Sequence, residues 1–376
     1  MKYDTVIVGS GISGLYYAYL NKHKKIIIVE SENRIGGRIG QTLFHNTKIV
    51  YGAGVGRLKK DILLKKILEE LNVEHSIYKS RINYIVPQKI NILEYLELLK
   101  QLYQPHLRSK LTFKKFLQKY MSPYEYFNFM CNTGYSDYLD ADIYDTLYDY
   151  GFDDNISGND MIQINWNDFL DKITNSIGLD KILLNKKVVK INTNQNIIHL
   201  RDGSTLQANK IILAIPPQNV YRLISKSIYR SIRSQTFCRY YVELDSQKSK
   251  DFIENITAMT YTYPPIQKII KISETVYMIS YSDNKSADKI RTLKPKELEN
   301  VILSITGFPI TIKDILIFYF DVGTHYFKPL STKWKNRIQF IREAQHPYPH
   351  ISVVGEALSR NQGWCEGALE SVINIL

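Results

Sequence analysis

The fold class is decided by the stretch Val6-Ile7-Val8-Gly9-Ser10-Gly11-Ile12-Ser13-Gly14-Leu15. A β-branched run reaches Gly9, and two more glycines follow at Gly11 and Gly14. In this spacing the first glycine permits a tight turn, the second lets the backbone approach a pyrophosphate, and the third lets a helix pack on the sheet. The helix N-terminus then presents its positive end to the phosphates. The stretch therefore predicts a strand, a turn and a helix that bind a dinucleotide.

A carboxylate stands where such a fold needs one. The second apolar run, Ile26-Ile27-Ile28-Val29, ends at Glu30. An acid at the end of the second strand accepts hydrogen bonds from an adenosine ribose and repels a 2′-phosphate. The other interpretation, a glycine turn without a ligand, explains neither the acid nor the strand and helix that flank the glycines.

The residues after Glu30 indicate which dinucleotide is bound. Five residues separate Glu30 from Gly36-Gly37-Arg38. This pattern resembles that of the flavin-containing amine oxidase superfamily, which includes monoamine and polyamine oxidases, L-amino-acid oxidases and protoporphyrinogen oxidase. The resemblance implies that the glycines bring a second loop against the pyrophosphate and that Arg38 lies beside the phosphates and the flavin. It also implies that the cofactor is FAD.

The C-terminal segment resembles the signature of the same superfamily. Gly355-Glu356 ends a strand, and Gly363-Trp364 precedes a helix rich in small residues. The resemblance implies that this helix begins directly under the isoalloxazine and that Glu356 lies near the ribityl chain and the phosphates. The positive end of a helix at that place stabilises negative charge on the reduced flavin.

Two further segments complete the predicted cofactor site. The glycine-rich run 52–56 stands where the superfamily passes near the flavin, but it lacks the usual preceding acid and following tryptophan; a flexible connection between domains is the alternative. The passage 166–217 resembles the superfamily's β-meander, in which Val188 contacts adenine through its backbone, and its last strand ends at Ala214 in a hinge. The predicted cofactor-binding residues are Gly9, Gly11, Ile12, Ser13, Gly14, Glu30, Ser31, Gly37, Arg38, Gly52, Ala53, Gly54, Val55, Val188, Ala214, Gly355, Glu356, Gly363, Trp364 and Gly367.

Aromatic side chains are predicted to form the substrate site. Trp364 stands between glycines and is interpreted as facing the substrate over the flavin rather than as core packing. The resemblance implies a second ring from the segment 323–327, with Tyr326 the first choice and Phe327 the second. Two rings offer the substrate amine an apolar wall and an electron-rich face, and they exclude water. Trp364 and Tyr326 are therefore the predicted catalytic residues.

Two positions depart from the superfamily pattern. A lysine near flavin N5 commonly comes from the strand that corresponds to 237–240, where this chain has Cys238 and Arg239. That departure leaves the route for activating O2 open. Members that tether FAD use a cysteine in the region of 322–327, which contains none. FAD is therefore predicted to bind non-covalently.

A dense acidic and aromatic stretch runs from Asp137 to Asp154 in an otherwise basic chain. One interpretation is an acidic funnel that attracts a cationic amine. The other is an amphipathic helix with its apolar side chains inward and its aspartates outward, and we favour this one.

Composition narrows the function classes. The net charge is +12, but the basic residues are dispersed without interleaved aromatics, so no specific nucleic-acid binding is expected. Three widely separated cysteines argue for a reducing compartment, and no metal site is predicted. With no signal peptide and no membrane-spanning run, we expect a soluble cytoplasmic protein. Heavy use of Lys, Ile, Asn and Tyr indicates an AT-rich genome, such as that of a large DNA virus, which makes virion association an option.

The expected architecture is α/β, with a discontinuous Rossmann-like FAD-binding domain and an α+β substrate domain. The first has a parallel sheet with a β-meander, and the second has a helical lobe and a mixed or antiparallel sheet. At 376 residues the chain is long enough for both. Helices are predicted at 62–71, 93–102 and 113–120 within a mainly helical region. The expected boundaries are 1–57, 161–219 and 345–376 for the FAD-binding domain, 58–160 for the lobe and 220–344 for the substrate-domain sheet.

The resemblance implies oxidation of a C–N bond in a small amine, with hydride transfer to flavin N5 and release of hydrogen peroxide after reoxidation by O2. Two alternatives stay open. One is another superfamily flavoenzyme, which desaturates a C–C bond or oxidises a porphyrinogen-like ring. The other is an FAD-holding structural or virion protein that has lost turnover. Peroxide release with a panel of amines distinguishes the three, whereas the substrate and the oligomeric state stay open.

Overall fold

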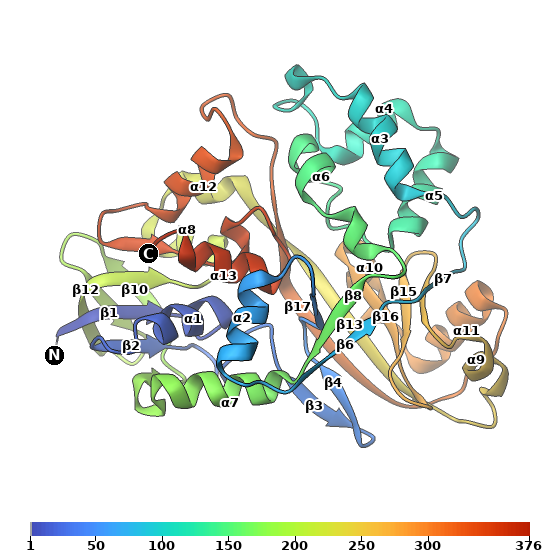
Figure 1. The fold of residues 1–376 in the computed structure, drawn as a ribbon, viewed down its shortest axis with the longest axis horizontal. Coiled ribbons are helices and arrows are strands. Elements are labelled where there is room, and N and C mark those ends of the chain that lie inside the picture. Colours follow the sequence, from blue (N-terminus) through green and yellow to red (C-terminus); the bar gives the residue numbers. More distant parts are fainter. Residues whose placement is uncertain (1) are drawn as a thin grey trace.

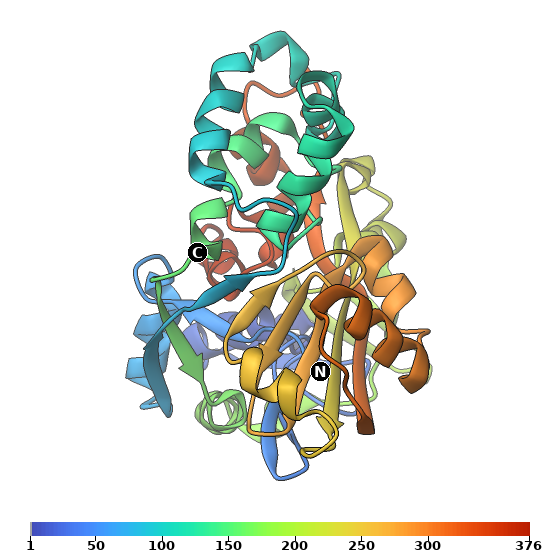
Figure 2. The ribbon, with the colours of Figure 1, turned by 90° about the vertical axis from the view of Figure 1, so that its right-hand side faces the viewer.

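The computed structural model describes residues 2–376, and Met1, at the start of the first expected domain segment, lies outside them. The chain builds one sheet with helices on both faces, a second sheet beside it, and a lobe of helices above the second sheet (Figures 1 and 2). Both chain ends lie with the first sheet (Figure 1).

The first sheet joins strands from distant parts of the chain. Its seven strands have the order β10-β11-β12-β1-β2-β9, with β18 also paired to β12. The pairs of β1 with β12 and β2, of β2 with β9, and of β12 with β18 are parallel, whereas β10, β11 and β12 form an antiparallel meander. The strands are β1 (Lys2–Val8), β2 (Ile26–Val29), β9 (Ile182–Leu183), β10 (Val188–Asn192), β11 (Ile197–Leu200), β12 (Thr205–Leu213) and β18 (Ile351–Val353).

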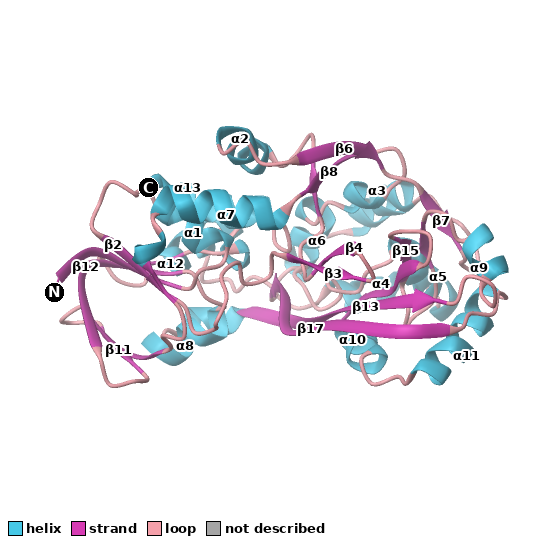
Figure 3. Ribbon diagram, turned by 90° about the horizontal axis from the view of Figure 1, so that it is seen from below, coloured by secondary structure: helices cyan, strands magenta, loops and turns pink. Residues whose placement is uncertain are grey.

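Both faces of this sheet are buried, as in parallel sheets that carry helices on each side. Side chains alternate along β1, so that Ile7 faces one core while Val6 and Val8 face the other. Helices α1, α2, α7 and α13 pack on the Ile7 side, and α8 and α12 pack on the other side; Figure 3 shows α1, α7 and α13 opposite α8. The helices are α1 (Ile12–Leu20), α2 (Ile62–Glu70), α7 (Trp166–Ile177), α8 (Pro217–Ile224), α12 (Arg337–Gln345) and α13 (Cys365–Ile373).

The second sheet has six strands in the order β17-β13-β16-β15-β14-β7. Its pairs are antiparallel except that of β14 with β7. The two longest strands, β13 and β17, reach from the far end of this sheet toward the first sheet, and helices α9, α10 and α11 share a core with it. The elements are β7 (Ile82–Tyr84), β13 (Ile232–Leu244), β14 (Met259–Tyr261), β15 (Lys268–Lys271), β16 (Val276–Asp283), β17 (Ile312–Phe327), α9 (Lys250–Asn255), α10 (Asn284–Ile290) and α11 (Pro295–Thr306).

The helical lobe has a separate core of aromatic and aliphatic side chains. Two smaller sheets connect the larger parts: the hairpin β3-β4, and the three strands β5-β8-β6. The lobe helices are α3 (Ile92–Leu102), α4 (Phe113–Tyr120), α5 (Pro123–Thr133) and α6 (Ile143–Asp149). The strands of the smaller sheets are β3 (Gln41–Phe44), β4 (Thr47–Val50), β5 (Val55–Arg57), β6 (His75–Lys79) and β8 (Asp160–Ile164).

The predicted α/β class is confirmed, as are the three predicted helices, which are α2, α3 and α4. The prediction of a mainly helical region over 58–160 was wrong for His75–Lys79 and Ile82–Tyr84, which form β6 and β7. All five residues of β6 are exposed, so the strand lacks the alternation of apolar and polar residues that would reveal it. Within residues 2–376, no helix combines the length and the apolar character needed to cross a bilayer.

Candidate functional site

The three glycines of the N-terminal turn have different roles. A Cβ atom on Gly9 would lie 2.5 Å from the Ala214 carbonyl oxygen, and one on Gly14 would lie 2.1 Å from the Gly9 carbonyl oxygen. Both positions therefore admit only glycine. A Cβ atom on Gly11 would meet nothing within 4 Å, so this residue faces open space at the start of α1. Helix α1 also lacks a side-chain cap and an acidic first turn, which leaves its positive end available to an anion.

Glu30 follows β2 at the same edge of the sheet. Its buried carboxylate accepts hydrogen bonds from the Ser10 backbone N–H (2.8 Å) and hydroxyl (2.9 Å), and from the Ser31 hydroxyl (3.1 Å). The loop with Gly36 and Gly37 lies alongside, since Gly36 donates its N–H to the Ser10 carbonyl oxygen (2.9 Å). The carboxylate is therefore fixed next to the glycine turn.

The other predicted cofactor residues of the sheet gather at this edge as well. Ala214 directly follows β12, Gly355 follows β18 by two residues, and Val188 begins β10 next to Lys186, whose N–H donates to the Glu30 carbonyl oxygen (2.6 Å). Ile12 and Ser13 are buried in the first turn of α1. In open α/β sheets, ligands bind outside the carboxyl ends of the parallel strands. The predicted residues therefore meet at the edge where this fold holds a dinucleotide.

A second group surrounds the buried carboxylate of Glu356. Arg38 Nη1 donates to Glu356 Oε1 (2.9 Å), the Gly363 N–H donates to Oε2 (2.9 Å), and His325 Nδ1 also bonds to Oε1. Burial favours a raised pKa for Glu356, but His325, the Arg38 guanidinium and the hydrogen bonds to the carboxylate lower the pKa overall. Glu356 is thus ionised and links β17 to the start of α13. His325 was not among the predicted site residues, because a histidine beside two aromatics has no distinguishing spacing.

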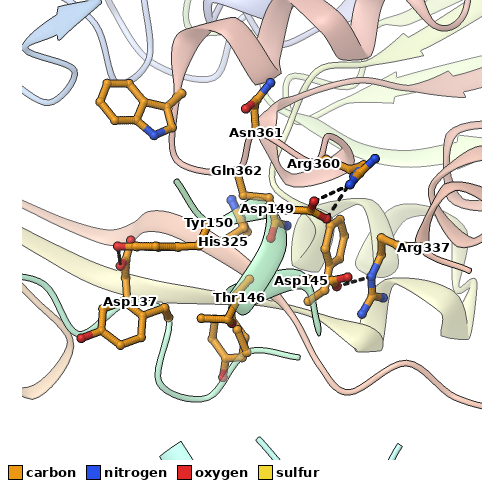
Figure 4. A pocket seen from close by; sticks show the side chains of 15 residues that line it. Asp137, Asp145, Thr146, Asp149, Tyr150, His325, Arg337, Arg360, Asn361 and Gln362 are labelled. Atoms are coloured by element: carbon orange, nitrogen blue, oxygen red, sulfur yellow. Dashed lines mark hydrogen bonds and ion pairs between the residues drawn. The ribbon is translucent and has the colours of Figure 1, made fainter. Parts of the chain in front are cut away.

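A cavity of about 40 Å³ lies between α6, the end of β17 and the loop before α13 (Figure 4). Trp364 and Tyr326 both line it, together with Phe327, His325 and Asp137. The Trp364 ring is also stacked by the Arg57 guanidinium, 4.0 Å from the ring centroid. Phe327 also packs edge-on against Phe340 of α12. Both rings belong to the core on the α8 and α12 side of the first sheet.

The chemistry of these groups fits a flavin dinucleotide. Gly11 leaves room for a pyrophosphate, Glu30 suits a ribose, and α13 begins without a side-chain cap, so that its positive end is available. The one acid in its first turn, Glu366, instead accepts from the backbone N–H groups of α2.

Comparisons with known proteins agree with this geometry. Residues 7–71 match the family model of the NAD(P)-binding Rossmann-like domain. Cyclohexylamine oxidase from Brevibacterium oxydans IH-35A superposes with a TM-score of 0.78 at 16% identity, over 99% of this chain and 97% of that chain. Putrescine oxidase with bound putrescine gives 0.76 at 13% identity, over 100% and 98%. The chain has the amine oxidase fold. No curated protein has significant sequence similarity to it.

Within this amine oxidase fold, the alternation of side chains along β13 determines which of two neighbours faces the glycine-rich segment 52–56. Cys238 is fully buried in the core behind the second sheet, and burial raises the pKa of its thiol to about 12. Arg239 points the other way, so that a Cβ atom on Gly54 would lie 3.0 Å from its Nη2. The guanidinium is buried beside Tyr281 (4.6 Å to the ring centroid), and its Nε has no hydrogen-bond partner. Arg239 therefore brings a positive charge next to the glycine-rich segment.

The glycine-rich segment itself packs on Arg38. A Cβ atom on Gly52 would lie 2.4 Å from the Arg38 carbonyl oxygen, to which Ala53 donates its N–H (3.0 Å). Val55 then begins β5. At the C-terminal end, a Cβ atom on Gly367 would lie 2.2 Å from the Asn361 carbonyl oxygen, so this glycine lets the loop close over α13.

The acidic stretch joins parts of the fold instead of opening a funnel. Asp142 and Asp145 pair with Arg108 and with Arg337 of α12. In the same way Asp149 pairs with Arg360, and Asp153 and Asp154 pair with residues near β5. These contacts favour the structural interpretation, although most of these aspartates bind arginines and lysines of other elements, and among the aspartates of this stretch only Asp140 and Asp153 are exposed. No cluster of metal-ligating residues occurs among the side chains that the structure describes.

Asp137 differs from its neighbours because its partner in the cavity is a phenol, Tyr150 (Figure 4). Burial and the charge of Asp283 raise the pKa of Asp137 to about 7. Between about pH 4 and pH 7 the folded state keeps a proton that the unfolded state has lost, so stability falls as the pH rises.

An Asp137→Asn variant is expected to lose this dependence. Its melting temperature should exceed that of the wild type by about 5 °C at pH 8 and match it at pH 4. Thermal unfolding at both pH values measures the difference. A gain of the same size at both pH values would contradict the role of the Asp137 charge.

Proposed function

We propose that this chain is an FAD-dependent amine oxidase. The observation that carries the proposal is the cavity in which Trp364, Tyr326 and Asp137 meet beside the uncapped start of α13. Two rings and one carboxylate are the groups that bind a small cationic amine. The amine oxidase fold supports the same conclusion, and so does the glycine cradle at the edge of the first sheet.

Each group in this proposal has a separate role. When bound, FAD supplies the acceptor for the hydrogen on the carbon next to the amine nitrogen. Trp364 and Tyr326 orient the amine and keep water from it, while Asp137 attracts the cationic substrate. The start of α13 and the Arg239 guanidinium direct positive charge toward the cofactor region, where negative charge develops during oxidation.

We also propose that FAD is held non-covalently, that O2 is the oxidant and that hydrogen peroxide is released. The three cysteines are free, which supports a reducing compartment such as the cytoplasm. We propose a large DNA virus as one source of the chain, and this proposal rests on the AT-rich composition alone.

The test begins with the colour of the purified protein. Acid precipitation should leave flavin in the supernatant, and flavin in the pellet would show a covalent bond. Anaerobic mixing with monoamines and diamines should then bleach the flavin, and peroxide should appear in air. Bound FAD without bleaching by any amine would refute the amine oxidase and leave an FAD-holding protein. Bleaching by a porphyrinogen or a C–C substrate alone would select the other flavoenzymes.

Trp364→Ala is expected to keep FAD but to slow flavin reduction by amine roughly 10–100-fold, or about 1.4–2.7 kcal/mol. Trp364→Phe should recover most of the rate, since a ring remains. Anaerobic stopped-flow bleaching with the best amine measures both variants. Unchanged bleaching in Trp364→Ala would remove this residue from the site.

A further inference from the structure

His325 has the surroundings of a proton acceptor. His325 lies near the end of β17 that borders the cavity. It is buried, with 5% of its surface exposed. One ring nitrogen, Nδ1, bonds to Glu356, while the other, Nε2, is buried without any hydrogen-bond partner. A buried polar atom without a partner is costly, so such an atom in a cavity wall suggests a ligand that completes it.

Glu356 sets which nitrogen of His325 is free. The carboxylate is ionised, because Arg38 and the Gly363 N–H both bond to it. An ionised carboxylate only accepts hydrogen bonds, so a neutral His325 carries its proton on Nδ1. Nε2 then has a lone pair, and Glu356 stabilises the imidazolium that forms when Nε2 takes a proton.

The other charged groups around the cavity are already paired. Asp145 pairs with Arg337, and Asp149 pairs with Arg360. These two ion pairs come from α6 on one side and from α12 and the loop before α13 on the other. Neither aspartate is available as a base while its arginine holds it.

The remaining titratable groups are Asp137 and three phenols. Burial raises the pKa values of Tyr138, Tyr150 and Tyr326 above the ordinary tyrosine range, so these groups stay protonated. Asp137 accepts the Tyr150 hydroxyl and is the one competing proton acceptor that faces the cavity. Unlike His325, whose Nδ1 bonds to the Glu356 carboxylate, Asp137 has its carboxylate occupied by the Tyr150 hydroxyl.

We propose that His325 accepts the proton that the substrate ammonium loses before oxidation. An ammonium nitrogen has no lone pair, and the adjacent carbon cannot release its hydrogen with both bonding electrons until that pair is available. In the step, one N–H bond of the ammonium breaks and one N–H bond forms at Nε2. The products are the neutral amine and an imidazolium bonded to Glu356. The inference rests on the proposed amine oxidase function.

The main test compares flavin bleaching over pH 6–10 in the wild type, His325→Asn and His325→Gln. At pH 7 both variants should bleach about 100-fold more slowly. The deficit should shrink steadily as the pH rises and disappear near pH 10, because an alkyl amine with a pKa of about 10 then increasingly arrives neutral. Added imidazole should restore part of the rate at pH 7.

The matched control is His350→Asn. His350 also has a buried Nε2 without a partner, but it stacks on Tyr348 outside the cavity. This variant should keep the wild-type rate and pH profile. FAD content of all variants reports on folding, and at least one of the two His325 variants must hold FAD at the wild-type level.

A second readout does not depend on turnover. α,α-Dimethylbenzylamine has no hydrogen on the carbon next to nitrogen and cannot be oxidised. Titration calorimetry at pH 8 in two buffers of different ionisation enthalpy counts protons released on binding. The wild type should release about none, because the proton moves to His325, and His325→Asn should release about one per amine.

The outcomes separate the inference from the proposed function. Wild-type protein that no amine bleaches would overturn both. A bleached wild type with an unchanged pH profile in His325→Asn would overturn only the role of His325. Loss of the pH dependence in Asp137→Asn instead would move the proton acceptor to Asp137 and also overturn it.

Discussion

A Gly11→Val variant is expected to fold normally and to be purified without its yellow cofactor. Gly11 has an ordinary extended backbone, with φ of −69°, and a Cβ atom there would touch nothing within 4 Å. The added side chain therefore costs the fold little. It would project instead into the space where the pyrophosphate approaches the backbone, so FAD affinity should fall at least about 100-fold, or roughly 3 kcal/mol.

The matched variant is Gly14→Ala, three residues along the same turn. Its Cβ atom would lie 2.1 Å from a backbone oxygen that cannot move aside, so the expected effect is on stability, by about 1–3 kcal/mol. Absorbance at 450 nm measures bound flavin, and thermal unfolding of the apoproteins measures stability. A Gly11→Val protein that keeps FAD would contradict the assignment of this turn to the cofactor.

Removing the charge of Asp142 is expected to destabilise the protein by about 3–5 kcal/mol. The Asp142 side chain is fully buried and pairs with Arg108 (3.1 Å) and Arg337 (3.2 Å), while the Leu330 N–H donates to it (2.7 Å). Arg337 is itself 4% exposed, so Asp142→Asn would leave a buried cation with one acidic partner fewer. The melting temperature should fall by about 5 °C.

Asp140→Asn provides the control for Asp142→Asn. Asp140 lies two residues away and is exposed, and no ion pair includes it among the residues that the structure describes. Its replacement should change stability by less than about 0.5 kcal/mol. If both variants melt alike, the buried ion pairs do not hold the lobe against the first sheet.

The sequence was most informative where chain geometry leaves no choice. Gly9 and Gly14 have no room for a side chain, and this local requirement produces a spacing that can be recognised without the structure. The amphipathic helix α3 was predicted to within one residue at its start for a similar reason, because the period of its buried side chains is local.

What could not be predicted depends on contacts between distant parts of the chain. Asp142 and Arg337 are 195 residues apart, and nothing near either residue reveals the other. His325 gains its surroundings from Glu356, which is 31 residues away, so its own neighbours in sequence carry no signal. Arg239 and Cys238 could be separated only by knowing which face of β13 meets the glycine-rich segment.

The first sheet also constrains how the protein is made. Strand β1 is synthesised long before its partner β12 and before β18, which pairs with β12, and α13 packs on the same face as α1. Roughly 350 residues separate the two uncapped helix starts, which takes on the order of 20–70 s at 5–20 residues per second. During that time the glycine turn at the start of α1 exists without the start of α13. A dinucleotide that needs both helix starts can therefore bind only after α13 has been synthesised.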